Sequence, residues 1–336
     1  LASKRAARNG WIGPMKSCRR HPNHYNREDT YGRLMSTTIS DAIVVGGGPA
    51  GVSCALWLQQ LGFHPTLVEQ NTRCGGLQLS NPYTNTWIAT SHDVHGADVA
   101  AAMHDNMVRH GVDMRLSERA VHANVSSLGG GLEMANGETV QGRYLVLAGG
   151  VAPKSGGFKS RLGLIVGPGH GVAKTNFEDA RVAILGGGDS AFENFDFVSQ
   201  RGAKEVVIFA RSIRARAEML DKVPPHCVVV GDYDVDEKNN TVNGQPFDQI
   251  VVLYGYEANR ESLLGLDVLM KSNGFVWTNE DCQTSQERVF AVGELAQRVH
   301  PCCVTAMADG VVAAKALQRR LETTRTAKFA GMAKRA

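Results

Sequence analysis

The sequence lacks any long apolar run, and it has few cysteines. Across its 336 residues no stretch approaches the roughly 18–20 consecutive apolar residues that a membrane-spanning helix needs, so we expect no membrane span. Seven cysteines occur without the regular spacing of a disulfide framework, in a chain large enough to fold without such staples. We therefore expect a protein of a reducing compartment, the cytoplasm.

The body of the chain also lacks an excess of positive charge. The formal net charge is +3, but residues 1–35 hold eight Lys or Arg against two acids, so the remainder is mildly acidic. Such a body shows no nucleic-acid surface. The Arg-rich leader 1–35 has no apolar core of a secretory signal. It is an organellar transit peptide or, as we favour, an upstream extension before a start at Met35, and we exclude it from the fold.

Metal-ligand patterns are weak. Cys18, His21 and His24 have a metal-like spacing, but they lie in the leader, which we expect to be disordered. Residues 91–95, SHDVH, bring two histidines and an acid into one short loop without a further ligand or an organised second shell. We expect no metal site.

Glycine is abundant, at 37 residues, and it marks two similar strand–turn–helix units. The first has an apolar strand at 41–45, the turn GGGPAG at 46–51, a helix at 52–61 and a second strand at 64–69. The second has a strand at 181–185, the turn GGGDSA at 186–191, a helix at 192–200 and a strand at 205–210. Two such units predict an α/β protein with two nucleotide sites.

Other segments carry weaker signals. Residues 122–147 predict a hairpin that turns at 136–137, and residues 227–254 predict short strands with a turn at 243–244. A strand at 289–294 should end in an acid, and a helix at 304–321 carries Ala and Gly on one side, which favours close approach to a neighbour. The basic tail beyond Arg320 should be solvated and frayed.

The first turn supplies the geometry that a pyrophosphate needs. Gly46 allows the tight turn, Gly48 lets phosphates approach the backbone, and Gly51 lets helix and strand pack closely. The helix N-terminus adds unpaired N–H donors and a partial positive charge. Glu69 ends the next strand, where it can accept hydrogen bonds from an adenosine ribose.

The second turn differs at the residue that meets the ribose. Gly186 and Gly188 again make a phosphate turn, but the following strand ends at Arg211 instead of an acid, and Arg216 follows. An arginine there accommodates the extra phosphate of NADPH. The alternative is that Arg211, Arg214 and Arg216 form only a solvated basic face.

These motifs resemble the low-molecular-weight thioredoxin reductase family, within the pyridine nucleotide-disulfide oxidoreductases. The resemblance runs from about residue 40 to 322, on GGGPAG (46–51), Glu69, CGGLQL (74–79), LVLAGG (145–150), GGGDSAFEN (186–194), FARSIRAR (209–216), FAVGE (290–294) and VTAMADG (304–310). It implies an FAD-dependent enzyme, with NADPH or NADH as donor, that forms a homodimer. It also implies two Rossmann-like domains of three layers (ββα), the NAD(P) domain 153–254 being inserted between the FAD-domain segments 36–152 and 255–322, with a basic tail at 323–336.

The resemblance also implies which residues meet the two cofactors. For FAD they are Gly46, Gly48, Pro49, Ala50, Gly51, Glu69, Gly75, Gly76, Gln78, Gly150, Gly293, Glu294 and Val304. For the nicotinamide nucleotide they are Gly186, Gly188, Asp189, Ser190, Ala191, Arg211 and Arg216.

The departures from this family concern electron transfer. Its members carry a Cys-x-x-Cys pair in the segment that leads into the second unit, but here that segment, 169–177, reads GHGVAKTNF. Flavin electrons therefore have no dithiol relay to a thioredoxin. The family's His-Arg-Arg is Ala210-Arg211-Ser212 here, which weakens the preference for NADPH, and Glu294 stands where the family has Asp.

Cys302 and Cys303 precede the terminal helix, at the position that the family places against the flavin. They are candidate catalytic thiols, as a charge-transfer thiolate or a vicinal disulfide, because a helix N-terminus lowers a thiol pKa. The alternative, which we favour, is a packing role.

We predict an FAD-dependent NAD(P)H oxidoreductase that passes electrons directly from reduced flavin to an external acceptor, a small redox protein or a small molecule. Three alternatives stay open: disulfide exchange at Cys302 and Cys303, a second FAD in the eroded NADPH site, and a non-catalytic flavin redox sensor.

Overall fold

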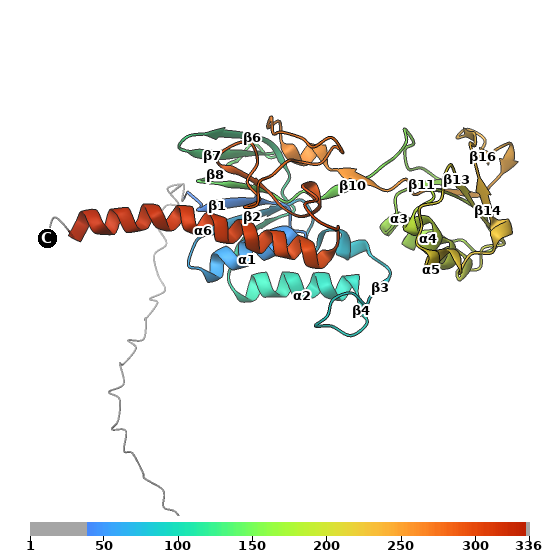
Figure 1. Ribbon diagram of the computed structural model, residues 1–336, viewed down its shortest axis with the longest axis horizontal. Coiled ribbons are helices and arrows are strands. Elements are labelled where there is room, and N and C mark those ends of the chain that lie inside the picture. Colours follow the sequence, from blue (N-terminus) through green and yellow to red (C-terminus); the bar gives the residue numbers. More distant parts are fainter. Residues whose placement is uncertain (1–38, 334–336) are drawn as a thin grey trace, which may run out of the picture. The chain divides into compact units, whose positions relative to one another are not determined.

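The computed structural model describes residues 39–333, so the leader with Cys18, His21, His24 and Met35 lies outside the described residues (Figure 1). Two parallel sheets of five strands form the frame, in the orders β20-β9-β1-β2-β5 and β11-β18-β12-β13-β14. Both carry helices, which confirms the predicted α/β class with two Rossmann-like units. The first sheet consists of β1 (Ala42–Val45), β2 (Pro65–Glu69), β5 (Asp113–Leu116), β9 (Leu145–Leu147) and β20 (Val289–Ala291).

Strand β1 lies in the middle of a three-layer unit. Its side chains alternate, so that Ala42 and Val44 join one buried cluster while Ile43 and Val45 join another. Helices cover the first face and an antiparallel three-stranded sheet covers the second (Figure 1). The helices are α1 (Pro49–Gln60), α2 (Gly96–Arg109) and α6 (Cys303–Ala333), and the covering strands are β6 (Ala120–Ser126), β7 (Gly129–Met134) and β8 (Thr139–Gly142).

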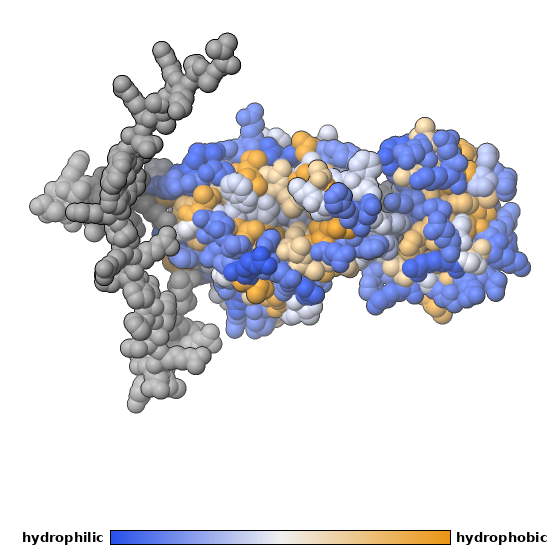
Figure 2. Space-filling view, turned by 90° about the horizontal axis from the view of Figure 1, so that it is seen from below, coloured by the Kyte–Doolittle hydropathy of each residue, from blue (hydrophilic) through white to orange (hydrophobic). Residues whose placement is uncertain are grey.

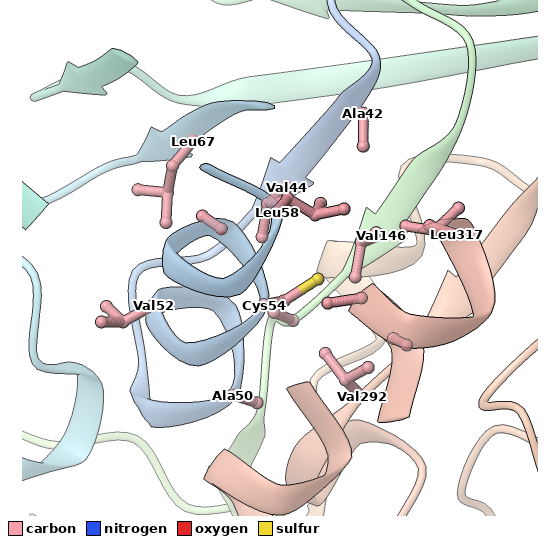
Figure 3. Close-up of a cluster of buried hydrophobic side chains, with 14 of the residues drawn as sticks. Ala42, Val44, Ala50, Val52, Cys54, Leu58, Leu67, Val146, Val292 and Leu317 are labelled. Atoms are coloured by element: carbon pink, nitrogen blue, oxygen red, sulfur yellow. The ribbon is translucent and has the colours of Figure 1, made fainter. Parts of the chain in front are cut away.

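Helices α1 and α6 pack closely, as the small residues of the terminal helix predict. A Cβ added at Gly310 would lie 2.3 Å from the Ala50 carbonyl oxygen, so only glycine fits there. The Ser53 hydroxyl donates a hydrogen bond of 2.8 Å to the Met307 carbonyl. In Figure 3, Cys54 points from α1 toward α6, within a cluster that joins both helices to the sheet. This packing holds the start of α6 beside the start of α1.

The second unit repeats the arrangement around β12. Ile184 of β12 and Phe192 of α4 lie in one buried cluster, on the helical face of this sheet. The turn predicted at 243–244 is confirmed, since Asn243 and Gly244 have φ of 50° and 73°. The elements are β11 (Leu164–Val166), α3 (His170–Lys174), β12 (Arg181–Leu185), α4 (Asp189–Ser199), β13 (Glu205–Ala210), α5 (Ala217–Leu220), β14 (Val228–Val230), β15 (Val235–Asp236), β16 (Thr241–Val242), β17 (Gln245–Pro246) and β18 (Gln249–Val252).

Short elements join these frames. Strands β10 (Val151–Pro153) and β19 (Tyr256–Ala258) pair antiparallel where the chain leaves and rejoins the first unit. The segment before α2 contains the paired strands β3 (Thr84–Asn85) and β4 (Val94–His95). The remaining turns are the 3-10 helices η1 (Gly76–Ser80), η2 (Pro225–Cys227), η3 (Arg260–Leu263) and η4 (Gly293–Leu295).

Several predicted boundaries are wrong. Helices α1 and α4 begin three residues before their predicted starts, α1 at Pro49, because proline is tolerated at the first helical position. The hairpin predicted at 122–147 is the three-stranded β6–β8, with a second turn near Leu128, and its last residues belong to β9. The strand predicted at 289–294 ends at Ala291, so Glu294 lies in η4.

The tail is helical where we expected fraying. Helix α6 continues to Ala333, because residues 322–330 hold no proline or glycine to stop it. Within residues 39–333 no helix combines the length and the apolarity needed to cross a membrane. On the face drawn in Figure 2, hydrophobic residues are interspersed with hydrophilic ones over the described part of the chain.

Candidate functional site

The first cleft opens at the carboxyl ends of β1, β2 and β9, and its volume is about 740 Å³. The chain runs from β1 to β2 on one side and returns to β9 on the other, so the cleft lies at a topological switch point of the sheet. Such a point is where open parallel sheets bind nucleotides, and the volume is that of a small-molecule site.

The glycines of the first turn have different roles. A Cβ at Gly46, whose φ is +110°, would lie 2.5 Å from the Ala148 carbonyl oxygen, and one at Gly51 would lie 1.9 Å from the Gly46 oxygen. At Gly48, in contrast, the nearest described atom would be the Gly76 Cα at 3.8 Å. The fold itself therefore requires Gly46 and Gly51, whereas Gly48 keeps open a space that a ligand can fill. No described side chain caps the N-terminus of α1, so its N–H groups are available to a diphosphate.

Glu69 is fixed at one end of this cleft. It is 6% exposed, and its Oε2 accepts a hydrogen bond of 2.6 Å from the Gly47 amide. Its Oε1 accepts from the Asn71 amide and from Asn71 Nδ2, at 2.8 and 2.6 Å. A carboxylate has about four acceptor positions, so one remains for a ribose hydroxyl. Asn71 was not predicted from the sequence, in which only the acid at the end of the strand marks this position.

The other end of the cleft contains Glu294 and Gln78. Strand β20, which leads to Glu294, lies beyond β9 on the side of β1 away from β2, so the cleft runs from Glu69 across the glycine turn to Glu294. Burial raises the pKa of Glu294. The Oε1 of Gln78 is buried and has no hydrogen-bond partner among residues 39–333. An orphaned acceptor in a cleft wall fits a ligand that supplies a donor there.

Two thiols lie at this same end. Cys302 precedes the first residue of α6, and its Sγ accepts a hydrogen bond of 3.4 Å from the Thr305 amide. Burial alone would raise the pKa of Cys302, but hydrogen bonds from Thr305 and from the Val304 amide lower it below its ordinary value. Burial, with the neighbouring Cys302 and Glu294, raises the pKa of Cys303 to about 11. The effect that we expected of a helix N-terminus is thus found at Cys302 and not at Cys303.

The remaining described cysteines lie elsewhere. Cys54, Cys74 and Cys282 are buried, Cys227 is in the second unit, and all of these thiols are free. Burial and the charge of Glu69 raise the pKa of Cys74 to about 11. These environments are those of unreactive packing residues.

A second cleft, of about 920 Å³, opens at the carboxyl ends of β12 and β13. A Cβ at Gly186, whose φ is +149°, would lie 2.3 Å from the Leu253 carbonyl oxygen, whereas a Cβ at Gly188 would meet no described atom within 4 Å. The pattern matches that of the first turn: one glycine serves the fold and one leaves room for a ligand.

One of the two predicted arginines lines the second cleft. Arg211 lines it, but the second arginine is Arg214, whose amide donates a hydrogen bond of 2.6 Å to the Gly187 carbonyl. Arg216 Nε lies 2.7 Å from Asp189 Oδ2, and neither is among the described residues that line the cleft. The role of Arg216 stays a prediction: in this structure its guanidinium forms an exposed ion pair with Asp189, the first residue of α4.

Most of the predicted FAD residues line the first cleft, but four are absent from the described lining: Gly51, Gly75, Gly293 and Val304. Of the residues predicted for the nicotinamide nucleotide, Gly186 and Arg211 line the second cleft, whereas Gly188, Asp189, Ser190, Ala191 and Arg216 are not among its described lining. The lining residues that sequence analysis missed include Asn71, Glu118, Arg119, Asn259 and Ser262 in the first cleft and Lys154, Arg214 and Tyr254 in the second.

The histidine loop 91–95 leads into α2, and His92 and His95 are exposed. Among the described residues no group of three or more His, Cys, Asp or Glu is arranged to hold a metal ion.

Comparison with known proteins identifies the family. The model of the pyridine nucleotide-disulphide oxidoreductase family matches residues 40–327. The chain belongs to this family. A bifunctional thioredoxin reductase/thioredoxin of Mycobacterium leprae is 28% identical over 84% of this chain and 66% of the relative, so the chain spans just under two thirds of that protein. A ferredoxin–NADP reductase of Ignicoccus hospitalis is 24% identical over 84% of this chain and 98% of the relative.

Solved structures share the fold. A thioredoxin reductase of Lactococcus lactis superposes with a TM-score of 0.71 at 18% identity, over 83% of this chain and 98% of its own. A bacillithiol disulfide reductase of Bacillus cereus superposes with a TM-score of 0.71 at 17% identity, over 84% of this chain and 100% of its own.

As a member of the pyridine nucleotide-disulphide oxidoreductase family, the chain is an enzyme, an oxidoreductase that uses FAD and NADPH. The first cleft fits FAD. The open space at Gly48 suits the diphosphate, and Glu69 suits the adenosine ribose. The unpartnered Oε1 of Gln78 suits a hydrogen-bond donor on the flavin half of the molecule. The second cleft fits a phosphorylated nucleotide, because Arg211 and Arg214 accompany its glycine turn. Bound flavin supplies the hydride and electron chemistry.

Proposed function

We propose that this NAD(P)H oxidoreductase passes electrons from its flavin directly to an external acceptor, without the disulfide relay of thioredoxin reductases. The observation that supports this most strongly is the segment 169–177, which runs through α3 toward β12. The segment contains no cysteine, and none occurs between Cys74 and Cys227. Cys74 is buried beside Glu69, and Cys227 lies in η2 of the second unit. Neither therefore replaces the missing pair.

The side chains of the two clefts support the donor half of this reaction. Gly48 and the open N-terminus of α1 would hold the FAD diphosphate, and Glu69 would orient the adenosine ribose. Arg211 and Arg214 would hold the nucleotide phosphate beside the second turn. The Arg pair at this position favours NADPH over NADH.

The proposed acceptor is a small redox protein or a small molecule. A ferredoxin is the first protein to try, because several relatives similar to this chain are named ferredoxin–NADP reductase. Ferricyanide is a suitable acceptor of the small-molecule kind, since it takes electrons without a thiol.

The decisive experiment compares thiol-dependent and thiol-independent acceptors. Under anaerobic conditions, NADPH should bleach the bound flavin, and ferredoxin or ferricyanide should restore its colour. A Cys302→Ser, Cys303→Ser double variant should still turn over with these acceptors, at whatever rate the altered cleft allows. Turnover with an oxidised thioredoxin at a comparable rate, abolished in the double variant, would overturn the proposal.

A second candidate is a dithiol oxidoreductase that uses Cys302 and Cys303, and the lowered pKa of Cys302 in the first cleft favours it. It requires a disulfide between adjacent residues, which strains the backbone. The two candidates separate on a disulfide substrate, because the second predicts that the wild type reduces it and that the double variant, although its flavin is still reduced by NADPH, does not.

We also propose that the enzyme is a homodimer of the cytoplasm, in line with the resemblance and with its six described free cysteines. Sedimentation of the purified holoenzyme would show a mass of twice 36.2 kDa. A monomer at micromolar concentration would refute the homodimer. Finding the full chain in an organelle of its cells would refute the cytoplasmic location.

A further inference from the structure

A cysteine occupies the N-cap position of α6, inside the FAD cleft. Ser, Thr, Asp and Asn are the usual residues there, because their side-chain oxygens accept the free N–H groups of the first turn. Here the acceptor is sulfur: the Thr305 amide lies 3.4 Å from Cys302 Sγ, and the Thr305 hydroxyl lies 3.3 Å from it. In return, Thr305 Oγ1 accepts a hydrogen bond of 3.1 Å from the Cys302 amide. The two residues form a reciprocal capping box.

We propose that Cys302 faces the flavin ring of bound FAD as a thiolate and forms a charge-transfer pair with the oxidised flavin. No bond is made or broken in this pair, and no net electron is transferred. The inference rests on FAD binding and is independent of the acceptor that finally takes the electrons.

The position of Cys302 follows from the strand order. Glu69, at the ribose end, ends β2, whereas Cys302 follows β20 on the other side of the glycine turn. An FAD whose adenosine lies at Glu69 and whose diphosphate lies at Gly48 must place its flavin half toward β20 and α6. The buried, unpartnered Oε1 of Gln78 lines the same cleft, which independently indicates a ligand with a hydrogen-bond donor.

Of the two neighbouring thiols, the surrounding charges favour ionisation of Cys302. Burial opposes the thiolate, the Thr305 hydroxyl and the amides of Thr305 and Val304 stabilise it by hydrogen bonds, and Glu294 opposes it. The thiol of Cys303 neighbours that of Cys302, and its pKa of about 11 keeps it protonated at neutral pH. The carboxyl of Glu294 is itself shifted toward its protonated form by burial, which lessens the repulsion. Cys302 is therefore the thiol of this cleft that ionises first.

The test is the absorption spectrum of the oxidised holoenzyme as a function of pH. A charge-transfer pair should give a broad band on the long-wavelength side of the flavin's own absorption. The band should disappear on acidification, with a midpoint below the ordinary thiol pKa of 9.0. Cys302→Ser should abolish the band at every pH, although serine still caps the helix and should preserve FAD content and melting temperature. The matched control, Cys303→Ser, should retain it.

Two further measurements distinguish the thiolate from a merely structural cap. Thr305→Val should move the midpoint of the band to higher pH, and Thr305→Ser should restore it, because serine returns the hydroxyl. In the apoprotein at pH 7, iodoacetamide should alkylate Cys302 at least about tenfold faster than Cys303, because the thiolate is the nucleophile, and added FAD should protect Cys302.

A band that persists in Cys302→Ser, or one that is absent from the wild type between acid and alkaline pH, would overturn this inference. Neither result bears on direct electron transfer, which is followed separately by the return of flavin colour with ferricyanide. Conversely, a charge-transfer band in an enzyme that reduces only a thioredoxin would sustain the thiolate and overturn the proposed function.

Discussion

Gly48 and Gly51 lie three residues apart in one turn, but alanine should affect them in different ways. The backbone at Gly48 has φ of −72° and ψ of 179°, which alanine adopts without strain, and its Cβ would point into the open cleft. Gly48→Ala should therefore leave the free energy of unfolding of the apoprotein unchanged or raise it by about 0.4–1 kcal/mol. The added methyl group would instead occupy the space of the diphosphate. Crowding of this kind costs about 1–3 kcal/mol, which weakens FAD binding by about 5- to 150-fold.

Gly51→Ala should show the opposite balance. Its Cβ would lie 1.9 Å from the Gly46 carbonyl oxygen, so the turn and the helix must separate. We expect the apoprotein to lose about 1–3 kcal/mol of its free energy of unfolding, or more because the obstructing atom is backbone.

The assay needs both apoproteins, freed of flavin. Urea unfolding gives the free energy of each, and titration with FAD, followed by quenching of flavin fluorescence, gives each dissociation constant. If Gly48→Ala binds FAD as tightly as the wild type, the cleft is not where the diphosphate lies, and the assignment of the first site is refuted.

Three other substitutions test the clefts. Glu69→Gln removes a carboxylate that accepts three N–H groups, and urea unfolding should show a loss of about 1.5–3 kcal/mol; an unchanged midpoint would contradict this role. Burial raises the pKa of Glu294 above its ordinary 4.5, so the folded apoprotein binds more protons than the unfolded chain and loses stability as pH rises through that interval. Thermal unfolding across pH should thus find the Glu294→Gln apoprotein more stable than the wild type at pH 7 and similar to it at pH 4, and a constant difference would refute the cause. Arg214→Ala should weaken NADPH about 10- to 100-fold and NADH little, in anaerobic flavin reduction, whereas Arg216→Ala should change this ratio less; the reverse order would restore the assignment made from sequence.

Local patterns were predicted well because they depend on adjacent residues. The run β1, turn and α1 could be read from β-branched residues followed by glycines, and Glu69 from its place at the end of the next strand. The ion pair of Arg216 with Asp189 could not be predicted, because the two residues lie in different elements. Which of Cys302 and Cys303 has the lowered pKa could not be predicted either, because this depends on where α6 begins and on the contact with Thr305.

The junction of α1 with α6 has a consequence for synthesis of the protein. Ser53 and Met307 are 254 positions apart in the chain, yet their hydrogen bond lies beside the FAD cleft. Glu294 and Cys302, which form one end of that cleft, leave the ribosome after the whole second unit. A nascent chain therefore has no complete flavin cleft until its last segment emerges, while the unit around β12 has all of its strands earlier. FAD can therefore meet a complete cleft only after the whole second unit has been synthesised.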